Sequence, residues 1–409
     1  MDSDPLVNNM SIVVQKYGGT SVRTETSREM IIENVKKMLE KDKQVVLVVS
    51  AIGRQGAPYA TDTLIEMVNQ IGVEPNKRDM DMLMSCGETI SSVVLSNTLK
   101  SHGIESVALT GFQAGILTTS NFGSASIVNI NPQRIFHFLD QKKVVVVAGF
   151  QGIDSEGDIT TLGRGGSDTT AVALGEALNA ELIEIYTDVD GIMTADPRVV
   201  NDANVLESVT YDEIYQMAVY GAKVVDHNAV AIARRARKPL VIKNTFSSAE
   251  GTVIADEQQL KDMLKESKKL ITAITSHDHV VQVNIEVEQG NNSEALLNAL
   301  EDKHIAMDMI NFFENRKIFT VAQNKQDDLT TILNDLNLPF SYSEECSKLT
   351  VVGYKIHVVP GIIKRTVMAL TKNDIEILQS TDSNTTISFL VKKEHAKSAV
   401  QILHEEFEL

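Results

Sequence analysis

The sequence predicts two regions of different architecture: an α/β region with a mostly parallel sheet at residues 11–255, and two similar smaller units at 270–340 and 348–409. In the first region, short β-branched apolar runs alternate with longer amphipathic stretches. In the second, apolar residues recur seventy positions apart. The length of 409 residues, at roughly 100–200 residues per domain, suggests two to four domains.

The strands expected in the first region are continuously apolar, which is typical of parallel strands buried on both faces. They cover 45–49, 144–148, 182–187 and 240–243. The stretches between them predict helices at 26–40, 62–70, 79–100, 132–140, 169–178 and 222–237. Pro132, preceded by Asn131, is a sound start for one of these helices. This alternation favours a parallel sheet covered by helices on both faces.

The second region contains an internal repeat. A shift of seventy positions aligns seven apolar pairs: Ala299/Ala369, Leu300/Leu370, Ile305/Ile375, Phe319/Phe389, Val321/Val391, Ile332/Ile402 and Leu333/Leu403. Gly290 and Gly361 align with one extra residue, in an expected strand-to-helix loop. Each unit is interpreted as a ferredoxin-like βαββαβ sandwich, with chance agreement of apolar residues as the alternative. A polar linker is expected near 247–267.

The chain is acidic, with 55 acidic against 38 basic side chains and a net charge of -17. This balance argues against a general nucleic-acid binder but allows a local basic pocket for a small anion. Cys86 and Cys346 lack the spacing of a metal site or a disulfide framework. No leader pattern opens the chain, and the longest apolar run, near 144–150, is far shorter than the ~20 residues of a membrane span. We expect a cytoplasmic protein without nucleic-acid or membrane partners.

The first candidate binding segment is 13–21, where an apolar strand ends in Lys16 and is followed by Gly18 and Gly19. Paired glycines let the backbone approach a phosphate, exposed amides donate to it, and the lysine supplies charge. The lysine precedes the glycines, so this is not a Walker A loop. An ordinary glycine turn is the alternative.

The second candidate segment is 161–170, which contains three glycines, Arg164 and Asp168 before an alanine-rich helix. Ser167 or Asp168 is expected to cap that helix, whose free amides would bind an anion. The planar guanidinium of Arg164 suits a carboxylate. A purely structural turn explains this combination poorly.

The third candidate segment, 186–198, follows a buried strand and mixes acidic residues with a turn glycine. Calcium binding is one interpretation, but the spacing does not match an EF-hand loop. A loop at the edge of a nucleotide is the favoured interpretation.

Together the three segments resemble the amino acid kinase family. Further motifs in the family's order occur at 49–51, 86–88, 111–115, 149–152 and 221–224. Within the family, the chain is most similar to the aspartokinases, in which a catalytic domain precedes tandem ACT domains. The resemblance therefore implies an amino acid kinase domain at 11–255 and ACT domains at 270–340 and 348–409.

The resemblance also implies a role for each matching residue. Lys16 and Lys223 would offset charge on the transferred phosphoryl group, and Asp168 would organise these lysines. ATP would be bound by Lys16, Tyr17, Gly18, Gly19, Tyr186, Thr187, Asp188, Met193, Thr194, Ala195, Asp196, Pro197 and Arg198. Substrate would be bound by Ser50, Thr61, Glu88, Arg164, Gly165, Gly166 and Ser167.

Two of these assignments have plain structural alternatives. Glu88 stands in the middle of a predicted helix and could simply form a local pair. Lys223, near a helix start, could be an exposed lysine. In the implied roles, Arg164 would hold a substrate carboxylate and Glu88 would face the substrate amino group.

The implied reaction is ATP-dependent phosphorylation of L-aspartate, with Mg²⁺ carried in by the nucleotide. The β-carboxylate would attack the γ-phosphate in line, so no protein nucleophile is needed. The first alternative is a sibling kinase acting on glutamate, N-acetylglutamate, carbamate or UMP. The second is a non-catalytic amino-acid sensor whose repeats bind ligand.

The chain departs from the family pattern in two loops. The connection at 51–62 is longer than in many members, although Thr61 and Asp62 fit its expected end. Lysine- and threonine-regulated relatives commonly carry a Pro-Asp-Lys-Pro-Gly type of loop, which is missing at 287–293. The resemblance thus favours the Gram-positive aspartokinase I group, with diaminopimelate as effector over lysine or threonine. Exposed edge strands in the repeats predict a homodimer.

Overall fold

The computed structural model describes residues 11–219, 225–263, 270–287 and 293–409. The chain forms two compact units, which are considered separately. Unit 1 comprises Met1–Ile192, Val205–Ala218 and Lys223–Glu266, and unit 2 comprises Met193–Asn204, Val219–Ala222 and Ser267–Leu409.

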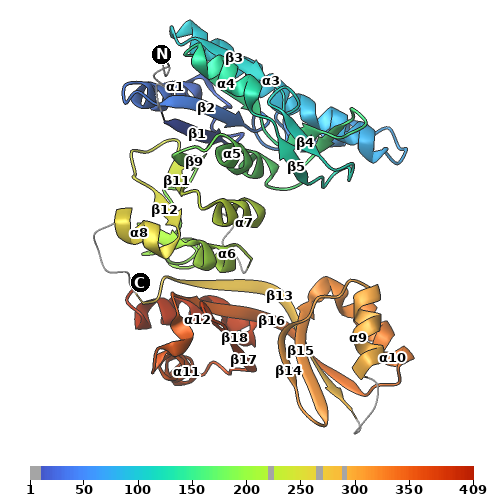
Figure 1. Cartoon of the computed structure of the whole chain (residues 1–409). Coiled ribbons are helices and arrows are strands. Elements are labelled where there is room, and N and C mark those ends of the chain that lie inside the picture. The colour runs from blue at the N-terminus through green and yellow to red at the C-terminus, as the bar shows by residue number, and fades with distance from the viewer. Residues whose placement is uncertain (1–10, 220–224, 264–269, 288–292) are drawn as a thin grey trace, which may run out of the picture. The chain divides into compact units, whose positions relative to one another are not determined.

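Unit 1 is built on an eight-stranded sheet with the order β10-β12-β11-β9-β1-β2-β6-β3 (Figure 1). Every neighbouring pair is parallel except β11 and β12. The strands are β1 (Ile12–Tyr17), β2 (Gln44–Val49), β3 (Ser106–Leu109), β6 (Val144–Ala148), β9 (Leu182–Thr187), β10 (Ser208–Thr210), β11 (Leu240–Asn244) and β12 (Thr252–Ala255). A second sheet has the order β5-β4-β7-β8, formed by β4 (Ile116–Thr118), β5 (Ile127–Ile130), β7 (Gln151–Ile153) and β8 (Ile159–Thr161).

Helices cover both faces of the large sheet. The helices of unit 1 are α1 (Glu25–Leu39), α2 (Thr61–Asn69), α3 (Lys77–Ser101), α4 (Gln133–Asp140), α5 (Gly166–Ala177), α6 (Tyr211–Val219), α7 (His227–Ala236) and α8 (Glu257–Met263). Side chains of α1 and α3 pack in one core with Val45 and Leu47 of β2. Val46 and Val48 alternate with them and are equally buried, while α5 packs against β1, β2 and β9. Burial on both faces explains why the run 45–49 of β2 is apolar throughout.

The four expected strands and five of the six expected helices are confirmed, apart from small shifts of their ends. The helix expected at 222–237 begins only at His227, and 222–224 lie outside the described residues. Asn131 accepts a hydrogen bond from the Gln133 backbone, so α4 begins where the Asn-Pro pair predicts. The linker expected near 247–267 was wrong. Most of this stretch is β12, which pairs with β11, and α8, both belonging to unit 1.

Unit 2 contains a six-stranded sheet with the order β14-β15-β13-β16-β18-β17. Its strands are β13 (Ala273–Glu286), β14 (Asp308–Phe312), β15 (Arg316–Ala322), β16 (Phe340–Val352), β17 (Gln379–Asp382) and β18 (Thr386–Lys392). Its helices are α9 (Ser293–Asp302), α10 (Gln326–Asp335), α11 (Ile362–Lys372) and α12 (Lys393–Glu406), with short 3₁₀ turns at Gln323–Lys325 and Ile356–Val358.

The two repeats share their central strands. The second half of β13 contributes Val281 and Val283 to the first core, whereas Ile274 from its first half packs in the second core. The second repeat ends in α12, so the closing strand expected from its own sequence was wrong. The first half of β13 takes that place by pairing with β16. Gly361 precedes α11 as expected, while Gly290 lies outside the described residues.

Residues 193–204, which follow β9 in the chain, fold as part of unit 2. The Thr194 hydroxyl is 2.9 Å from Nε2 of His404, and its carbonyl accepts from the Ile274 backbone at 2.8 Å. The side chain of Gln401 donates to the Val199 carbonyl at 2.8 Å. Half of the third candidate segment therefore belongs to the same compact body as the repeats.

The cysteines and the helices were also considered in the sequence analysis. Cys86 is exposed and Cys346 is buried, and both are free thiols. Among the described residues, none of the helices combines the length and apolar character needed to cross a membrane.

Candidate active site

The first candidate segment lies at the carboxyl end of the central strand β1, between β2 and β9. Nζ of Lys16 is 2.7 Å from Oδ1 of Asp168, and both side chains are 13% exposed. The turn after β1 needs glycine, because a Cβ at Gly19 would lie 2.4 Å from the Gly53 carbonyl oxygen. Close backbone packing thus gives Gly19 a structural reason, and the role of this segment toward phosphate stays a prediction.

The second candidate segment forms the start of α5, opposite the first. Gly165, in the left-handed region at φ 72°, is the N-cap, and no side chain caps this helix. The expected cap by Ser167 or Asp168 was wrong, because both lie inside the first turn. Asp168 pairs with Lys16 instead. The Gly166 and Asp168 amides donate to the carbonyls of Gly163 and Gly165, each at 3.0 Å. A Cβ at Gly165 would lie 2.3 Å from Cγ of Asp226, so only glycine fits.

Glu88 projects from the middle of α3 and is 3% exposed. Its Oε1 accepts a hydrogen bond from the Ala51 backbone at 3.0 Å, while Oε2 is buried without a hydrogen-bond partner among the described residues. Desolvation by burial raises the pKa of this carboxyl to about 7. A buried carboxylate with one unpartnered oxygen is suited to bind a cationic group of a ligand. A purely structural pair would not leave that oxygen without a partner.

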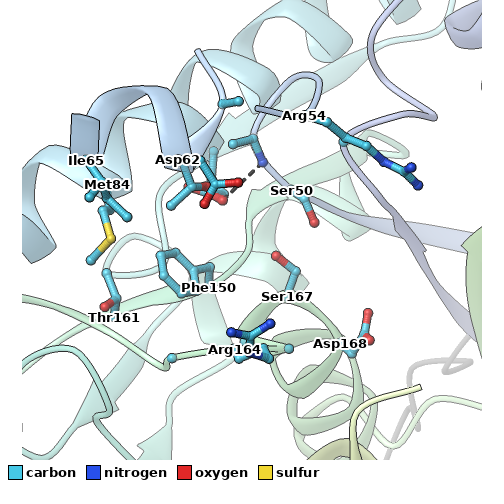
Figure 2. Close-up of a pocket in the computed structure, with 18 of the residues that line it drawn as sticks. Ser50, Arg54, Asp62, Ile65, Met84, Phe150, Thr161, Arg164, Ser167 and Asp168 are labelled. Carbon is cyan, nitrogen blue, oxygen red and sulfur yellow. Dashed lines mark hydrogen bonds between the residues drawn. The ribbon is translucent and has the colours of Figure 1, made fainter. Parts of the chain in front are cut away.

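These groups meet in one cavity of about 740 Å³ (Figure 2). Figure 2 shows Ser50, Ser167, Asp168 and Arg164 converging from β2, α5 and the loop before it. Ten of the predicted site residues line this cavity: Lys16, Gly19, Ser50, Thr61, Glu88, Arg164, Gly165, Gly166, Ser167 and Asp168. The cavity thus brings together the partly buried Lys16, two arginines, three carboxylates and the N-terminus of α5.

The structure does not bring the other predicted residues to this cavity wall. The rings of Tyr17 and Tyr186 stack at 4.6 Å inside the core and are almost fully buried, so only their backbones are available to a ligand. Thr187 is the last residue of β9, and Asp188 follows it. Met193, Thr194, Ala195, Asp196, Pro197 and Arg198 belong to unit 2, and Lys223 lies outside the described residues. Their roles toward ATP stay predictions.

Sequence reasoning missed Asp81, a fully buried residue of α3. Its Oδ2 accepts hydrogen bonds from the backbones of Thr161 at 2.8 Å and Gly123 at 2.9 Å, and its Oδ1 accepts from the Thr161 hydroxyl. Thr161 and Gly123 both line the cavity. The available signal was the spacing, because Asp81 precedes Glu88 by seven residues and so shares its helix face.

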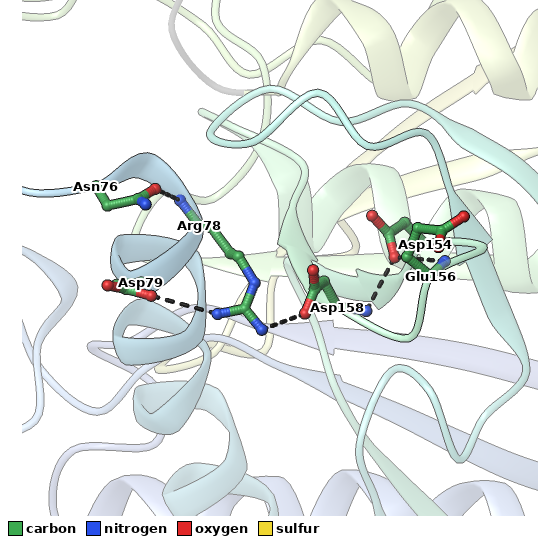
Figure 3. A network of polar contacts seen from close by, with 6 residues as sticks. All are labelled: Asn76, Arg78, Asp79, Asp154, Glu156 and Asp158. Atoms are coloured by element: carbon green, nitrogen blue, oxygen red, sulfur yellow. Dashed lines mark hydrogen bonds and ion pairs between the residues drawn. The ribbon is translucent and has the colours of Figure 1, made fainter.

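A second, exposed network fastens the start of α3 to the β7–β8 turn (Figure 3). Arg78 forms an ion pair with Asp158 and a weaker one, at 3.4 Å, with Asp79. The hydrogen bond from Arg78 lowers the pKa of Asp158. Asp154 accepts from the Asp158 backbone at 2.9 Å, which shapes the turn. The network therefore stabilises the turn before β8, and Asp81 binds Thr161 at the other end of this strand.

A third group missed from the sequence is polar and lies within the large sheet. Glu184 of β9 is 1% exposed and accepts from Gln15 and Lys243, each at 2.7 Å. The Tyr186 hydroxyl donates to the same carboxylate at 3.3 Å. These bonds tie β1, β9 and β11 together just before the loops that carry the site. Because 182–187 was predicted as a continuously apolar strand, Glu184 was not identified from the sequence as a functional or structural residue.

The fold and the cavity define an α/β protein whose candidate site lies at the carboxyl ends of parallel strands, where open α/β sheets bind their ligands. The cavity presents Lys16 and Arg164 beside the carboxylates of Glu88 and Asp168. Sequence comparison narrows the class: the family model "Amino acid kinase family" matches residues 11–244, and an "ACT domain" model matches 341–405. The chain belongs to the aspartokinases, a group within the amino acid kinase family.

Curated relatives match over nearly the whole chain. Aspartokinase 1 of Bacillus subtilis is 43% identical over 404 residues, which cover 98% of this chain and 100% of the relative. The aspartokinase of Geobacillus stearothermophilus is 37% identical and covers 98% of each chain. The resemblance inferred from the motifs is confirmed.

Solved structures of aspartokinases share the fold. Escherichia coli aspartokinase III, crystallised with aspartate and ADP, aligns with a TM-score of 0.77 at 23% identity, covering 97% of this chain and 100% of that one. The aspartate kinase of Clostridium acetobutylicum also aligns with a TM-score of 0.77, at 20% identity over the same shares. The predicted fold class, an amino acid kinase fold followed by ACT domains, is confirmed.

Proposed function

We propose that this chain is an aspartate kinase that transfers the γ-phosphoryl group of ATP to the β-carboxylate of L-aspartate, giving 4-phospho-L-aspartate and ADP. The observation that carries the proposal is the single cavity that joins Lys16 and Asp168 to Glu88 and Arg164. The names of the full-length relatives support the same reaction.

The phosphate half of the site is formed by the turn after β1 and the start of α5. Backbone amides at Gly18 and Gly19, and the amide of Ser167 in the first turn of α5, would bind phosphate oxygens. Lys16 would offset the charge of the group in transfer, held in place by Asp168 at 2.7 Å. Lys223 is proposed as the second cation on the basis of the family motif.

The amino-acid half of the site is formed by α3 and the loop before α5. The guanidinium of Arg164 would bind the α-carboxylate through its two-pronged geometry. The unpartnered Oε2 of Glu88 would accept from the substrate ammonium. Ser50, Thr61 and Ser167 line the same wall and would hold the β-carboxylate for in-line attack, which needs positioning and charge stabilisation rather than a protein nucleophile.

Mg²⁺ is expected to enter with the nucleotide. Within the described ranges, no three His, Cys, Asp or Glu side chains are grouped so as to hold a metal. The donor set therefore suits a metal bound mainly by phosphate oxygens, with the carboxylate of Asp168 beside them. When bound, the metal supplies positive charge that offsets charge on the transferring group.

We propose feedback regulation through unit 2 and assembly as a homodimer. Ile310, Phe312 and Phe313, on and after the edge strand β14, are exposed apolar side chains that a second copy would cover. Diaminopimelate is proposed as effector over lysine or threonine because the sequence resembles the Gram-positive aspartokinase I group. The loop that distinguishes these groups, 287–293, lies mostly outside the described residues. Light scattering with and without effector tests the assembly, and a monomer under both conditions would contradict it.

The decisive experiment is ATP turnover with hydroxylamine trapping of the acyl phosphate. L-Aspartate is expected to give hydroxamate, whereas product from glutamate, N-acetylglutamate, carbamate or UMP alone would assign a sibling kinase. Turnover on none of them would favour the amino-acid sensor. Repeating the assay with diaminopimelate, lysine or threonine identifies the effector as the additive that inhibits.

A further inference from the structure

Arg54 is a cation in the cavity wall that the proposed reaction leaves without a role. It belongs to the loop after β2, and Figure 2 shows it at the edge of the site with its guanidinium turned away from Asp62. Its Nη2 forms an ion pair with Oδ2 of Asp188 at 2.6 Å. The two side chains are 69% and 43% exposed, so neither is fixed by burial.

The loop that carries Arg54 is anchored directly on the glycine turn. The Gly53 backbone donates to the Gly19 carbonyl at 2.9 Å. A Cβ at Gly19 would lie 2.4 Å from the Gly53 oxygen and 2.5 Å from the Ala51 oxygen, so the two backbones are in contact. Arg54 is therefore the first side chain beyond the residue that touches the predicted phosphate turn. Hydrogen bonds from Ala57 to the Arg54 carbonyl and from Ala60 to the Ala57 carbonyl keep the loop compact.

The ion pair crosses the carboxyl end of β1. Arg54 follows β2 and Asp188 follows β9, and β1 lies between these two strands in the sheet. A contact between the two flanking loops must pass over the end of β1, where Lys16 and the glycines stand. The ion pair therefore lies at the same edge of the sheet as the glycine turn.

We propose that Arg54 binds the triphosphate of ATP, giving up Asp188 in exchange for phosphate oxygens. This inference rests on the proposed function. An exposed ion pair contributes little stability, whereas a guanidinium bound to phosphate forms charge-assisted, two-pronged hydrogen bonds, so the exchange is favourable. Lys16 is already paired with Asp168, and Arg164 is assigned to the substrate carboxylate. Arg54 then adds a further cation to Lys16 and the proposed Lys223 at the triphosphate.

The test is equilibrium binding of Mg²⁺ complexes of AMP-PNP and ADP, and of AMP, measured by calorimetry. Arg54→Ala is expected to weaken AMP-PNP binding about tenfold, because a charge-assisted hydrogen bond is lost, and to leave AMP binding unchanged. Arg54→Lys should fall between wild type and the alanine variant, since it keeps the charge but not the planar fork. Salt should weaken AMP-PNP binding less steeply in the alanine variant than in wild type.

Arg235→Ala is the matched control, because Arg235 forms an ion pair with Glu176 at 3.3 Å with similar exposures of 72% and 40%. It should bind all three nucleotides as wild type does. Equal loss of AMP-PNP and AMP affinity in Arg54→Ala would overturn the inference by showing that the loop merely collapses. So would AMP-PNP binding equal to that of the control. Failure of wild type to bind AMP-PNP at all would overturn the proposed function, and this inference with it.

Discussion

The two units use their β-sheets for different purposes. In unit 1, β2, β1 and β9 run parallel, so the loops after all three strands meet at one edge and carry Ser50, the glycine turn and Asp188. In unit 2, the central strands β13 and β16 run antiparallel, and β13 contributes to two cores. A parallel sheet gathers reactive groups at one edge, whereas a shared antiparallel pair joins two repeats into one folding body.

In unit 1, buried carboxylates stabilise the strand ends and loops around the cavity. Asp81 and Glu184 each accept three hydrogen bonds at the base of loops that line or flank the cavity. Such groups hold strand ends and loops in a fixed geometry, because an unmade hydrogen bond in the interior is costly. The comparison therefore predicts that substitutions at the buried polar groups of unit 1 affect catalysis and stability together. Substitutions in the cores of unit 2 are expected to affect stability and regulation without removing a group from the cavity.

Lys16→Ala tests the proposed role of the site at the carboxyl ends of the parallel strands, and it has the largest expected effect. We expect kcat/KM for ATP and aspartate to fall about a thousandfold, because charge at the transferring group is lost while the fold is kept. Lys36→Ala is the control, since Lys36 forms an exposed ion pair with Glu33 on α1. Turnover close to that of the control, with the same circular dichroism, would contradict the assignment of Lys16.

Glu88→Gln tests the amino-acid half of the site. Because the pKa of Glu88 is about 7, wild-type KM for aspartate should rise as pH falls below 7 and the carboxylate is protonated. The glutamine variant should have a KM raised about tenfold or more at pH 8 and no such pH dependence. A wild-type KM that is flat between pH 6 and 8 would contradict this role.

The same variant makes an opposite prediction for stability. The raised pKa means that the folded state binds the proton more tightly than the unfolded state, so burial of the charge costs stability once pH exceeds the ordinary value of 4.5, and the full cost is reached above 7. At pH 8 the free energy of unfolding of Glu88→Gln should then exceed that of wild type by up to about 3 kcal/mol, with a correspondingly higher Tm. Near pH 4.5 the variant should show little gain in stability. Equal gains at both pH values would point to packing instead.

Asp81→Asn asks whether a buried residue away from the ligand positions the site. It should lower the free energy of unfolding by about 2 kcal/mol, because an amide replaces an acceptor-only carboxylate facing the Thr161 and Gly123 amides. KM for aspartate should rise more than KM for ATP, since Thr161 leads into the loop of Arg164. Asp79→Asn, on the exposed face of the same helix, is the control. Equal effects on both KM values would contradict a specific positioning role.

Thr194→Val tests whether 193–204 folds with the repeats. The Thr194 hydroxyl accepts from the Asn204 backbone at 3.0 Å and bonds His404, and the residue is 3% exposed. Its loss should reduce the unfolding free energy by about 1–2 kcal/mol in urea. Thr194→Ser keeps the hydroxyl and should recover most of this. Fast hydrogen exchange at 193–204 in wild type, with β13 protected, would contradict the conclusion that this segment folds with the repeats.

Arg78→Ala should have the smallest effect. The ion pair with Asp158 is solvent-exposed, and such pairs contribute little and are screened by salt. We expect a slight decrease in Tm at low salt that disappears at high salt, with unchanged kcat. A loss comparable to that of Asp81→Asn would show that the exposed network (Figure 3), rather than the buried carboxylate, holds the β7–β8 hairpin.

Much of unit 1 was predictable because local patterns agree with the final packing. The strands at 144–148 and 182–187 have the predicted bounds, since continuous apolar runs flanked by polar turns have few other stable positions. The glycines, Lys16, Arg164 and Asp168 were found because phosphate and carboxylate binding demand these residue types in short segments. Those ten residues meet in one cavity because parallel strands end at one edge.

The sequence by itself determined the strand–helix order, the repeat and the chemistry of the short motifs, because each depends on residues close together in the chain. Only the tertiary structure decided that Gly165 caps α5, that Asp81 holds Thr161, and that Arg54 reaches Asp188. It also decided that β13 serves two cores and that 193–204 folds with the repeats. These outcomes depend on contacts between residues far apart in sequence, where burial and hydrogen-bond satisfaction override local preference.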